Sequence, residues 1–302
     1  MEEINHTEEQ QTESKDSLSN GARRNQILRR IAIAGVIAAV ITAAFTGYYL
    51  HQECVEEKKQ EEVLKAEKAR KQKEAKTKKE KTETEEQKLE RVRSQAEEQG
   101  VPQNVIELLD KNAETVDFVA DYEKKKDEPY ADTIGVDLSK GGIPELLQWD
   151  ERWGYAPYGT GIVATSGCGP TCMAMVAAGL NQDASITPAK VAAYGTEHSY
   201  MDEENNTYWR FMDEAGANWN LNSVGGLLSE EQVSAELAQG HPIICSMGPG
   251  DFTQIGHFIV LTGYENGNVK VNDPFSIKNT NTTWVFANIK DQIKAMWTFS
   301  KK

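Results

Sequence analysis

The sequence Gly167-Cys168-Gly169-Pro170 lies directly before a run of small and apolar residues that ends at Leu180. Proline is favoured in the first turn of a helix, so this pattern predicts a buried helix that begins at or beside Cys168. The free N–H groups and the positive dipole end of a helix favour an anion, and the thiolate is the reactive form of cysteine. A thiol among apolar residues is also typical of an inert core position, so the motif alone leaves both interpretations open.

Three polar residues elsewhere in the chain complete a candidate active site. Gln148 precedes the cysteine, His257 opens the run GHFIVLTGY, and Asp273 lies at the end of the run NVKVNDP. Together with Cys168 they provide a thiolate, a base, a carboxylate that orients the base and an amide donor for an oxyanion. The complete set favours the nucleophile interpretation of Cys168.

Five separated segments carry a resemblance to a known family. They are LLQWDERWG, SGCGPTCMAMV, HPIICSMGPGDF, GHFIVLTGY and VNDP, and they occur in the family's order. Over roughly residues 137 to 302 the chain resembles the peptidase C-39-like family, papain-superfamily cysteine peptidases related to the peptidase domains that trim bacteriocin leaders. The resemblance implies an α+β papain-like fold, in which an N-terminal helix carrying the cysteine packs on an antiparallel sheet. It also implies Cys168 as nucleophile, His257 as general base, Asp273 as the group orienting His257, and Gln148 as oxyanion donor.

Other assignments of the polar residues stay open. Cys172 stands where many relatives carry serine, and it is either a regulatory thiol or a packing residue. His198 and His241 are alternative bases, although both lie in sequence typical of loops. The C-x3-C spacing of Cys168 and Cys172 and the wide separation of the histidines are unfavourable for a zinc site. We therefore expect no metal and no cofactor.

A charge-free run from Ile31 to Leu50 predicts one transmembrane helix over residues 27–50. Its twenty residues, at about 1.5 Å each, span roughly the 30 Å of bilayer hydrocarbon. Four arginines precede it, which predicts a cytoplasmic N-terminus and a C-terminal domain outside the cell. Together with the family resemblance, this implies the outer face of the cell membrane of a bacterium with a single membrane. A cleaved signal peptide is the alternative to this signal anchor, because small residues occur in ITAAFTG. Cys54 follows as an incidental free thiol or, alternatively, an inter-chain disulfide partner.

Composition divides the remaining chain. Residues 1–26 are polar and predict a disordered cytoplasmic tail. Residues 51–99 contain Glu and Lys four positions apart, which predicts a charged helical spacer, with a dimeric coiled coil as the weaker alternative. Gly100 and Pro102 end that helix, residues 100–136 form a helical lead-in that packs on the domain, and residues 137–302 form the peptidase domain. A net charge of −14 and the lack of a basic patch in the sequence argue against nucleic acid as a partner.

Within the domain, local signals predict further elements. Thr187 and Ser229 are helix caps, the latter with Gln232 in a capping box, and Gly240 ends the second helix. Four strands are predicted, over residues 242–247, 257–264, 269–273 and 282–287, with Asn266-Gly267 as a hairpin turn.

The register of this hairpin tests whether Asp273 can lie beside His257. In strict register Asp273 lies opposite Val260, which puts its side chain on the face opposite that of His257. A bulge or a bend is needed to bring the two side chains together.

Two functions of different class follow. The first is a membrane-anchored, externally facing cysteine peptidase that cleaves an amide of a peptide or cell-wall peptide by Cys-His acyl transfer. The alternative is a catalytically silent surface binding or scaffolding module with the same fold. The enzyme is favoured because each polar role is filled by a chemically competent residue.

Overall fold

The computed structural model describes residues 83–302, together with the isolated residues 35, 47, 51, 65 and 68. Residues Thr84–Lys302 form one compact unit. None of the described helices is long and apolar enough to cross a membrane. The predicted tail 1–26, nearly all of the predicted membrane helix 27–50, Cys54 and most of the predicted spacer lie outside the described residues.

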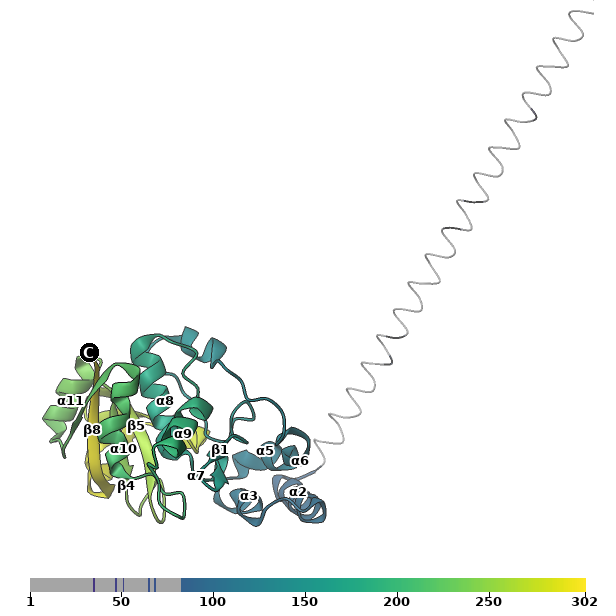
Figure 1. Ribbon diagram of the computed structural model, residues 1–302, viewed down its shortest axis with the longest axis horizontal. Helices are drawn as coiled ribbons and strands as arrows, with labels where there is room; N and C mark the ends of the chain where they lie inside the picture. The colour runs from purple at the N-terminus through teal and green to yellow at the C-terminus, as the bar shows by residue number, and fades with distance from the viewer. Residues whose placement is uncertain (1–34, 36–46, 48–50, 52–64, 66–67, 69–82) are drawn as a thin grey trace, which may run out of the picture. The chain divides into compact units, whose positions relative to one another are not determined.

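A six-stranded antiparallel sheet forms the centre of this unit, with the strand order β3-β8-β4-β5-β6-β7 (Figure 1). The strands are β3 (Leu221–Gly225), β4 (Ile243–Met247), β5 (His257–Glu265), β6 (Asn268–Asn272), β7 (Trp284–Val285) and β8 (Ile293–Lys301). A separate short hairpin joins β1 (Pro157–Tyr158) and β2 (Gly161–Ile162). The predicted α+β class with an antiparallel sheet is confirmed.

The two faces of the sheet bury different cores, because successive side chains of a strand point to opposite sides. Val260 belongs to the core around helix α8 (Cys168–Asn181). Its neighbour Ile259 belongs to the core shared with helix α11 (Glu230–Ala238). Strand β5 is therefore covered on both faces, and α8, with all residues from Met173 to Ala178 fully buried, is apolar on every side.

Local capping signals fix where the predicted helices begin. The Thr187 hydroxyl accepts a hydrogen bond from the Lys190 N–H at 3.3 Å, and helix α9 (Pro188–Glu197) starts there. Ser229 and Gln232 form the predicted capping box at the start of α11. The other helical segments of the C-terminal part are α7 (Val163–Ser166), α10 (Trp209–Glu214), η3 (Ala215–Trp219), α12 (Ile277–Thr280), α13 (Phe286–Ile289) and η4 (Lys290–Gln292).

The lead-in is a bundle of short helices with its own buried cluster. It contains α2 (Glu85–Gln99), α3 (Gln103–Ile106), α4 (Leu108–Lys111), η1 (Ala113–Thr115), α5 (Val116–Ala120) and α6 (Tyr122–Lys125), and η2 (Gly135–Lys140) follows. Figure 1 shows α2, α3, α5 and α6 gathered at the end of the unit away from α11. Buried Val105 and Phe118 of the bundle pack with Tyr155 and Ala164 of the domain, so the lead-in packs on the domain as the sequence predicts.

The compact unit begins before residue 99, where the sequence predicts the end of the spacer. Helix α2 starts at Glu85 and is part of the compact unit, because Val92 and Ala96 are buried in the lead-in cluster. Its exposed face carries the same charged pattern as the preceding residues, which hides this change of role in the sequence. Gly100, with a φ of 76°, ends the helix as expected.

The strand prediction is incomplete at the C-terminal end. Of residues 282–287, Trp284–Val285 forms strand β7, and the chain then turns into α13. Strand β8 was not predicted, although Ile293, Ala295, Trp297 and Phe299 alternate along it with other residues. It lies between β3 and β4, so it is an interior strand of the sheet.

The hairpin between β5 and β6 turns at Asn266 and Gly267 as predicted, with φ angles of 51° and 81°. These positive angles are those that a two-residue hairpin turn requires. A Cβ atom on Gly267 would contact nothing closer than 3.9 Å, so only the backbone angle opposes a side chain there.

Replacement of Gly267 by alanine should therefore lower the free energy of unfolding by about 1 kcal/mol, the typical strain of a left-handed non-glycine residue. Urea unfolding of the purified protein measures this change. Gly263→Ala, in the same hairpin, is the matched control, because its Cβ would meet the Lys270 Cβ at an ordinary 3.6 Å. Equal losses in the two variants would contradict the assignment of strain to the turn.

Candidate active site

Cys168 is the first residue of helix α8, and its side chain is half-buried with a free thiol. Gly167 caps the helix, directly after the short helix α7. A Cβ atom on Gly169 would lie 2.7 Å from the Thr207 hydroxyl, so the residue after the cysteine has no room for a side chain. The structure thus places the thiol at a helix start, as the sequence predicts.

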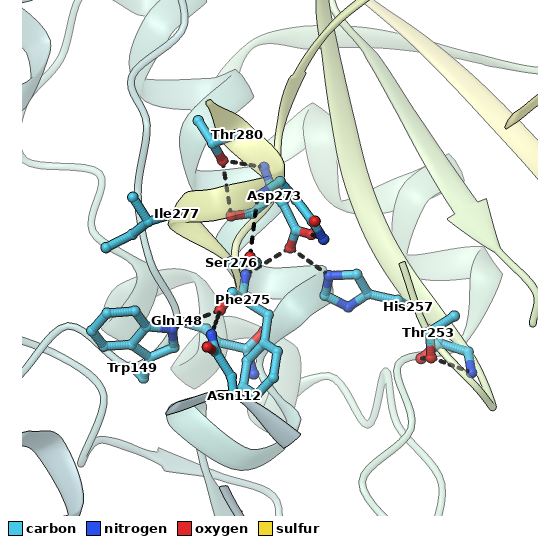
Figure 2. A network of polar contacts seen from close by, with 12 residues as sticks. Asn112, Gln148, Trp149, Thr253, His257, Asp273, Phe275, Ser276, Ile277 and Thr280 are labelled. Atoms are coloured by element: carbon cyan, nitrogen blue, oxygen red, sulfur yellow. Dashed lines mark hydrogen bonds and ion pairs between the residues drawn. The ribbon is translucent and has the colours of Figure 1, made fainter. Parts of the chain in front are cut away.

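His257 and Asp273 form a buried pair. The Nε2 atom of His257 lies 2.8 Å from Oδ1 of Asp273, and the Asp273 residue is only 2 % exposed (Figure 2). The other ring nitrogen, Nδ1, is not engaged by Asp273, and Cys168 lines the same cleft as His257 and contributes to its raised pKa. The structure therefore bonds His257 to Asp273 and brings the Cys168 thiol to the same cleft as the imidazole.

A β-bulge makes this meeting geometrically feasible. Glu265 pairs with Asn268 and Gly263 with Lys270, but the register then shifts, so that Leu261 pairs with Val271 and Val260 with Asn272. Thr262 is the extra residue of the shift. Val260 is thus opposite Asn272 instead of Asp273, and Asp273 comes to the same face as His257. This is the irregularity that the hairpin register required.

Both carboxylate oxygens of Asp273 have further donors. Oδ1 also accepts the Phe275 N–H at 2.8 Å, and Oδ2 accepts the Asn279 side-chain amide at 2.7 Å. The Asp273 N–H donates to the Thr280 hydroxyl at 2.9 Å. Figure 2 shows the Asp273 side chain held between helix α12 and the imidazole of His257.

The contact between His257 and Asp273 shifts the pKa values of both groups. Burial alone lowers the pKa of His257, but the charge of Asp273 and its hydrogen bond, with Cys168 contributing, outweigh burial and raise that pKa to about 10. Burial alone raises the pKa of Asp273, but the charge of His257 and the hydrogen bonds from His257, Asn279 and Phe275 hold that pKa below its usual range. The imidazole is therefore protonated and the carboxylate ionised at neutral pH.

Gln148 is buried, 4 % exposed, beside the thiol. Its Nε2 donates to the Ala164 carbonyl at 2.8 Å, and its Oε1 has no partner among the described residues. The amide nitrogen has two hydrogens, so one stays available for a ligand. The Gln148 backbone N–H donates to the Pro274 carbonyl at 2.7 Å, which joins this residue to the loop that carries Asp273.

A cleft of about 600 Å³ opens over these residues. Cys168, His257, Gln148 and Thr165 lie along it, and the loop between β4 and β5 forms one wall through residues 250–256. Leu108, Asp110 and Lys111 of α4 also line it. The lead-in therefore contributes directly to the cleft.

The remaining thiols and histidines lie elsewhere. Cys172 and Cys245 are fully buried, and burial raises the pKa of both thiols, so they are packing residues. His198 stacks on Tyr194, and His241 bonds the Glu236 carboxylate at 2.8 Å. Across the described ranges, no three potential ligands are grouped so as to hold a metal ion.

The family model described as "Peptidase_C39 like family" matches residues 142–302, which is more than half of the chain. The chain belongs to this family. The match starts after the lead-in and contains Cys168, His257, Asp273 and Gln148. No curated protein matches the chain.

Three solved structures are similar to this C39-like chain. The peptidase domain of Streptococcus ComA, a bifunctional ABC transporter, is 19 % identical, with 46 % of this chain and 93 % of that chain covered and a TM-score of 0.37. A putative C39-like peptidase from Bacillus anthracis is 15 % identical, with 53 % and 95 % covered and a TM-score of 0.36. A double glycine motif protease from an AMS/PCAT transporter, in complex with the leader peptide, is 16 % identical, with 44 % and 86 % covered and a TM-score of 0.30.

Several residues around the C39-like site were not found from the sequence. Asn279 is one of them. The local pattern that could have indicated its position is Ser276, whose hydroxyl accepts the Asn279 N–H at 3.1 Å and caps the short helix α12. Phe275 and the loop 250–256 line the cleft without a recognisable motif. The contribution of Leu108 and Lys111 depends on how the lead-in folds back, which no local pattern reports.

Asp273→Asn should lower the pKa of His257 from its wild-type value of about 10, because only the smaller contribution of Cys168 then opposes the effect of burial. NMR titration of the imidazole Cε1–H resonances measures this, with the other histidines as internal references.

In the wild type the pKa of His257 in the folded protein lies above its value in the unfolded chain. The stabilisation from His257 is therefore complete below pH about 6.5 and is lost as the pH rises through about 10. An unchanged His257 titration in the variant would contradict the pair.

Proposed function

We propose that this C39-like chain is a cysteine peptidase that hydrolyses an amide bond of a peptide or cell-wall peptide. The observation that carries the proposal is that the Cys168 side chain lies along one cleft with the His257 imidazole, which is bonded to the Asp273 carboxylate. Membership of a peptidase family supports a peptide substrate. The cleft carries apolar Phe252 and Ile255 on its wall, which could contact apolar side chains of a peptide.

The acylation step uses each group in one role. The Cys168 thiolate attacks the amide carbon, a C–S bond forms, and the carbonyl electron pair moves onto oxygen. The second Nε2 hydrogen of Gln148, with the backbone N–H of Cys168 at the helix start, stabilises that oxyanion. The His257 imidazolium gives its proton to the leaving nitrogen as the C–N bond breaks.

Deacylation reverses the proton path. Neutral His257 takes a proton from water, the resulting hydroxide attacks the thioester carbon, and the C–S bond breaks to release the acid and the thiolate. Asp273 stays ionised throughout and holds Nε2–H of His257, so that Nδ1 faces the sulfur. Its role is therefore orientation and charge stabilisation.

We also propose that residues 27–50 anchor the chain in a cell membrane, with the peptidase domain on the outer face. The support is the uncharged run from Ile31 to Leu50 and the four arginines that precede it. An external peptidase domain would meet peptides and cell-wall peptides at the surface, which agrees with the proposed substrate class.

Cys168→Ala should abolish amide hydrolysis, because no other described thiol reaches the cleft. The measurement is product release, followed by mass spectrometry, from a peptide library and from purified cell-wall stem peptides. Cys172→Ala is the matched control, one helical turn away in the core, and should keep activity. Turnover that survives in Cys168→Ala would refute the mechanism. A wild-type Cys168 that is alkylated with an ordinary thiol pH profile would instead favour a binding module.

The anchor has its own test. The wild-type chain should stay with the membrane pellet through an alkaline carbonate wash, and protease added to intact spheroplasts should digest the peptidase domain. Ile37→Arg combined with Ile41→Arg should release it, because an arginine at the centre of a membrane helix costs about 2.5–3.5 kcal/mol. Leucine at the same two positions is the matched control. Wild-type chain in the carbonate supernatant, or loss of an N-terminal tag from the mature chain, would refute the uncleaved anchor.

A further inference from the structure

The segment that carries Asp273 is held from outside the family domain. Asn112 and Glu114 belong to the lead-in, before the matched residues 142–302. The Asn112 side-chain amide donates to the Phe275 carbonyl at 2.6 Å, to which the Trp149 indole N–H also donates at 2.8 Å (Figure 2). The backbone on the C-terminal side of Asp273 is thus bonded both to the domain and to the lead-in.

Glu114 makes the more specific contact. Its Oε2 accepts the Ile277 N–H at 2.8 Å, and its Oε1 accepts the Lys278 N–H at 3.0 Å. These are the first two residues of helix α12. The N–H groups of a first helical turn have no partner within the helix, and a carboxylate that accepts them makes charge-assisted hydrogen bonds. Glu114 therefore fixes both the start and the direction of α12.

Helix α12 in turn fixes the carboxylate of Asp273. Asn279, in its third position, donates to Oδ2 of Asp273 at 2.7 Å, and Thr280 accepts the Asp273 N–H at 2.9 Å. Only the Oδ1 atom then faces His257. A four-residue helix has little stability of its own, so its placement depends on the groups that hold its ends.

The conformation of Glu114 is itself well determined. Asn112 accepts the Glu114 N–H at 3.0 Å and donates to its Oε2 at 3.1 Å. Thr115, fully buried, donates to the Asn112 carbonyl at 2.8 Å. The turn η1 therefore presents the Glu114 carboxylate from a rigid base in the lead-in cluster.

We propose that Glu114 is a positioning residue of the active site, which acts through α12 and Asn279 on Asp273 and so on the orientation of His257. The inference rests on the proposed peptidase function. It makes the lead-in a working part of the catalytic unit, although the family domain begins after it.

The test measures the second-order rate of Cys168 alkylation by iodoacetamide against pH, in the full-length chain in detergent. Glu114→Ala should react about tenfold more slowly at the acid end of the profile, because it removes both charge-assisted hydrogen bonds to α12 and part of that loss reaches Asp273. Its acid-side limb should move to higher pH, because a loosened Asp273 stabilises the imidazolium less. Glu114→Gln keeps one acceptor oxygen and the side-chain volume, so it should lie between alanine and wild type and keeps the test valid if the alanine variant does not fold.

The matched control is Tyr155→Phe. The Tyr155 hydroxyl donates to the Phe118 carbonyl at 2.9 Å, which is another bond between the domain and the lead-in but does not touch the Asp273 segment. The control should lower the thermal unfolding midpoint without moving the alkylation profile. A Glu114 variant that does the same, with a lower midpoint and an unmoved profile, would overturn the inference and leave a structural role only.

Two further outcomes separate this inference from the proposed function. If Glu114 acts through α12, the double variant Glu114→Ala, Asn279→Ala should show a smaller fold-reduction in alkylation rate than the product of the two single reductions. Reductions that multiply would overturn this inference but not the proposed function. If wild-type Cys168 reacts as an ordinary thiol, the proposed function falls and the inference with it. If the wild type reacts at acid pH and the Glu114 variants react equally fast, the proposed function stands and Glu114 has no positioning role.

Discussion

The candidate active site depends on a buried ion pair between His257 and Asp273. Both groups lose water when they are buried, and such a loss is offset only when each charge is paired and its remaining hydrogen-bonding positions are filled. Asp273 meets this condition through the Phe275 N–H and the Asn279 amide, in addition to the imidazole. The segments that surround the carboxylate, from the end of β6 to α12, are arranged as donors toward it.

The rest of the fold brings the thiol to this pair. Strand β5 is interior in the sheet and covered on both faces, so His257 projects from the first residue of a well-fixed strand. Helix α8 is buried on all sides and packs on the same sheet, and Cys168 is its first residue. The sulfur and the imidazole are thus positioned by two rigid elements, and only the cleft walls come from loops and from the lead-in.

The elements that sequence reasoning found are those specified by local chemistry. The Thr187 cap, the Ser229 capping box and the Asn266-Gly267 turn each involve residues within three positions of one another, and all are present. Strand β8 is absent from the predicted elements although it alternates from Ile293 to Phe299, whereas the short edge strand β3, with the mostly polar or exposed sequence LNSVG, carries little signal. The predicted site residues lie in one part of the structure, but the two supporting contacts of Glu114 join residues 163 and 164 positions apart, and no local pattern encodes such a contact.

The bulge at Thr262 gives the site a dependence on parity. A strand exposes alternate residues to alternate faces, so one residue more or less between the base and its carboxylate moves the carboxylate to the other side of the sheet, and two residues restore it. A homologous chain could keep a cysteine, a histidine, an aspartate and a glutamine in every recognisable motif and still have no oriented imidazole. For proteins of this type, the number of residues between the motifs of strands β5 and β6 therefore carries functional information that the motifs themselves do not contain.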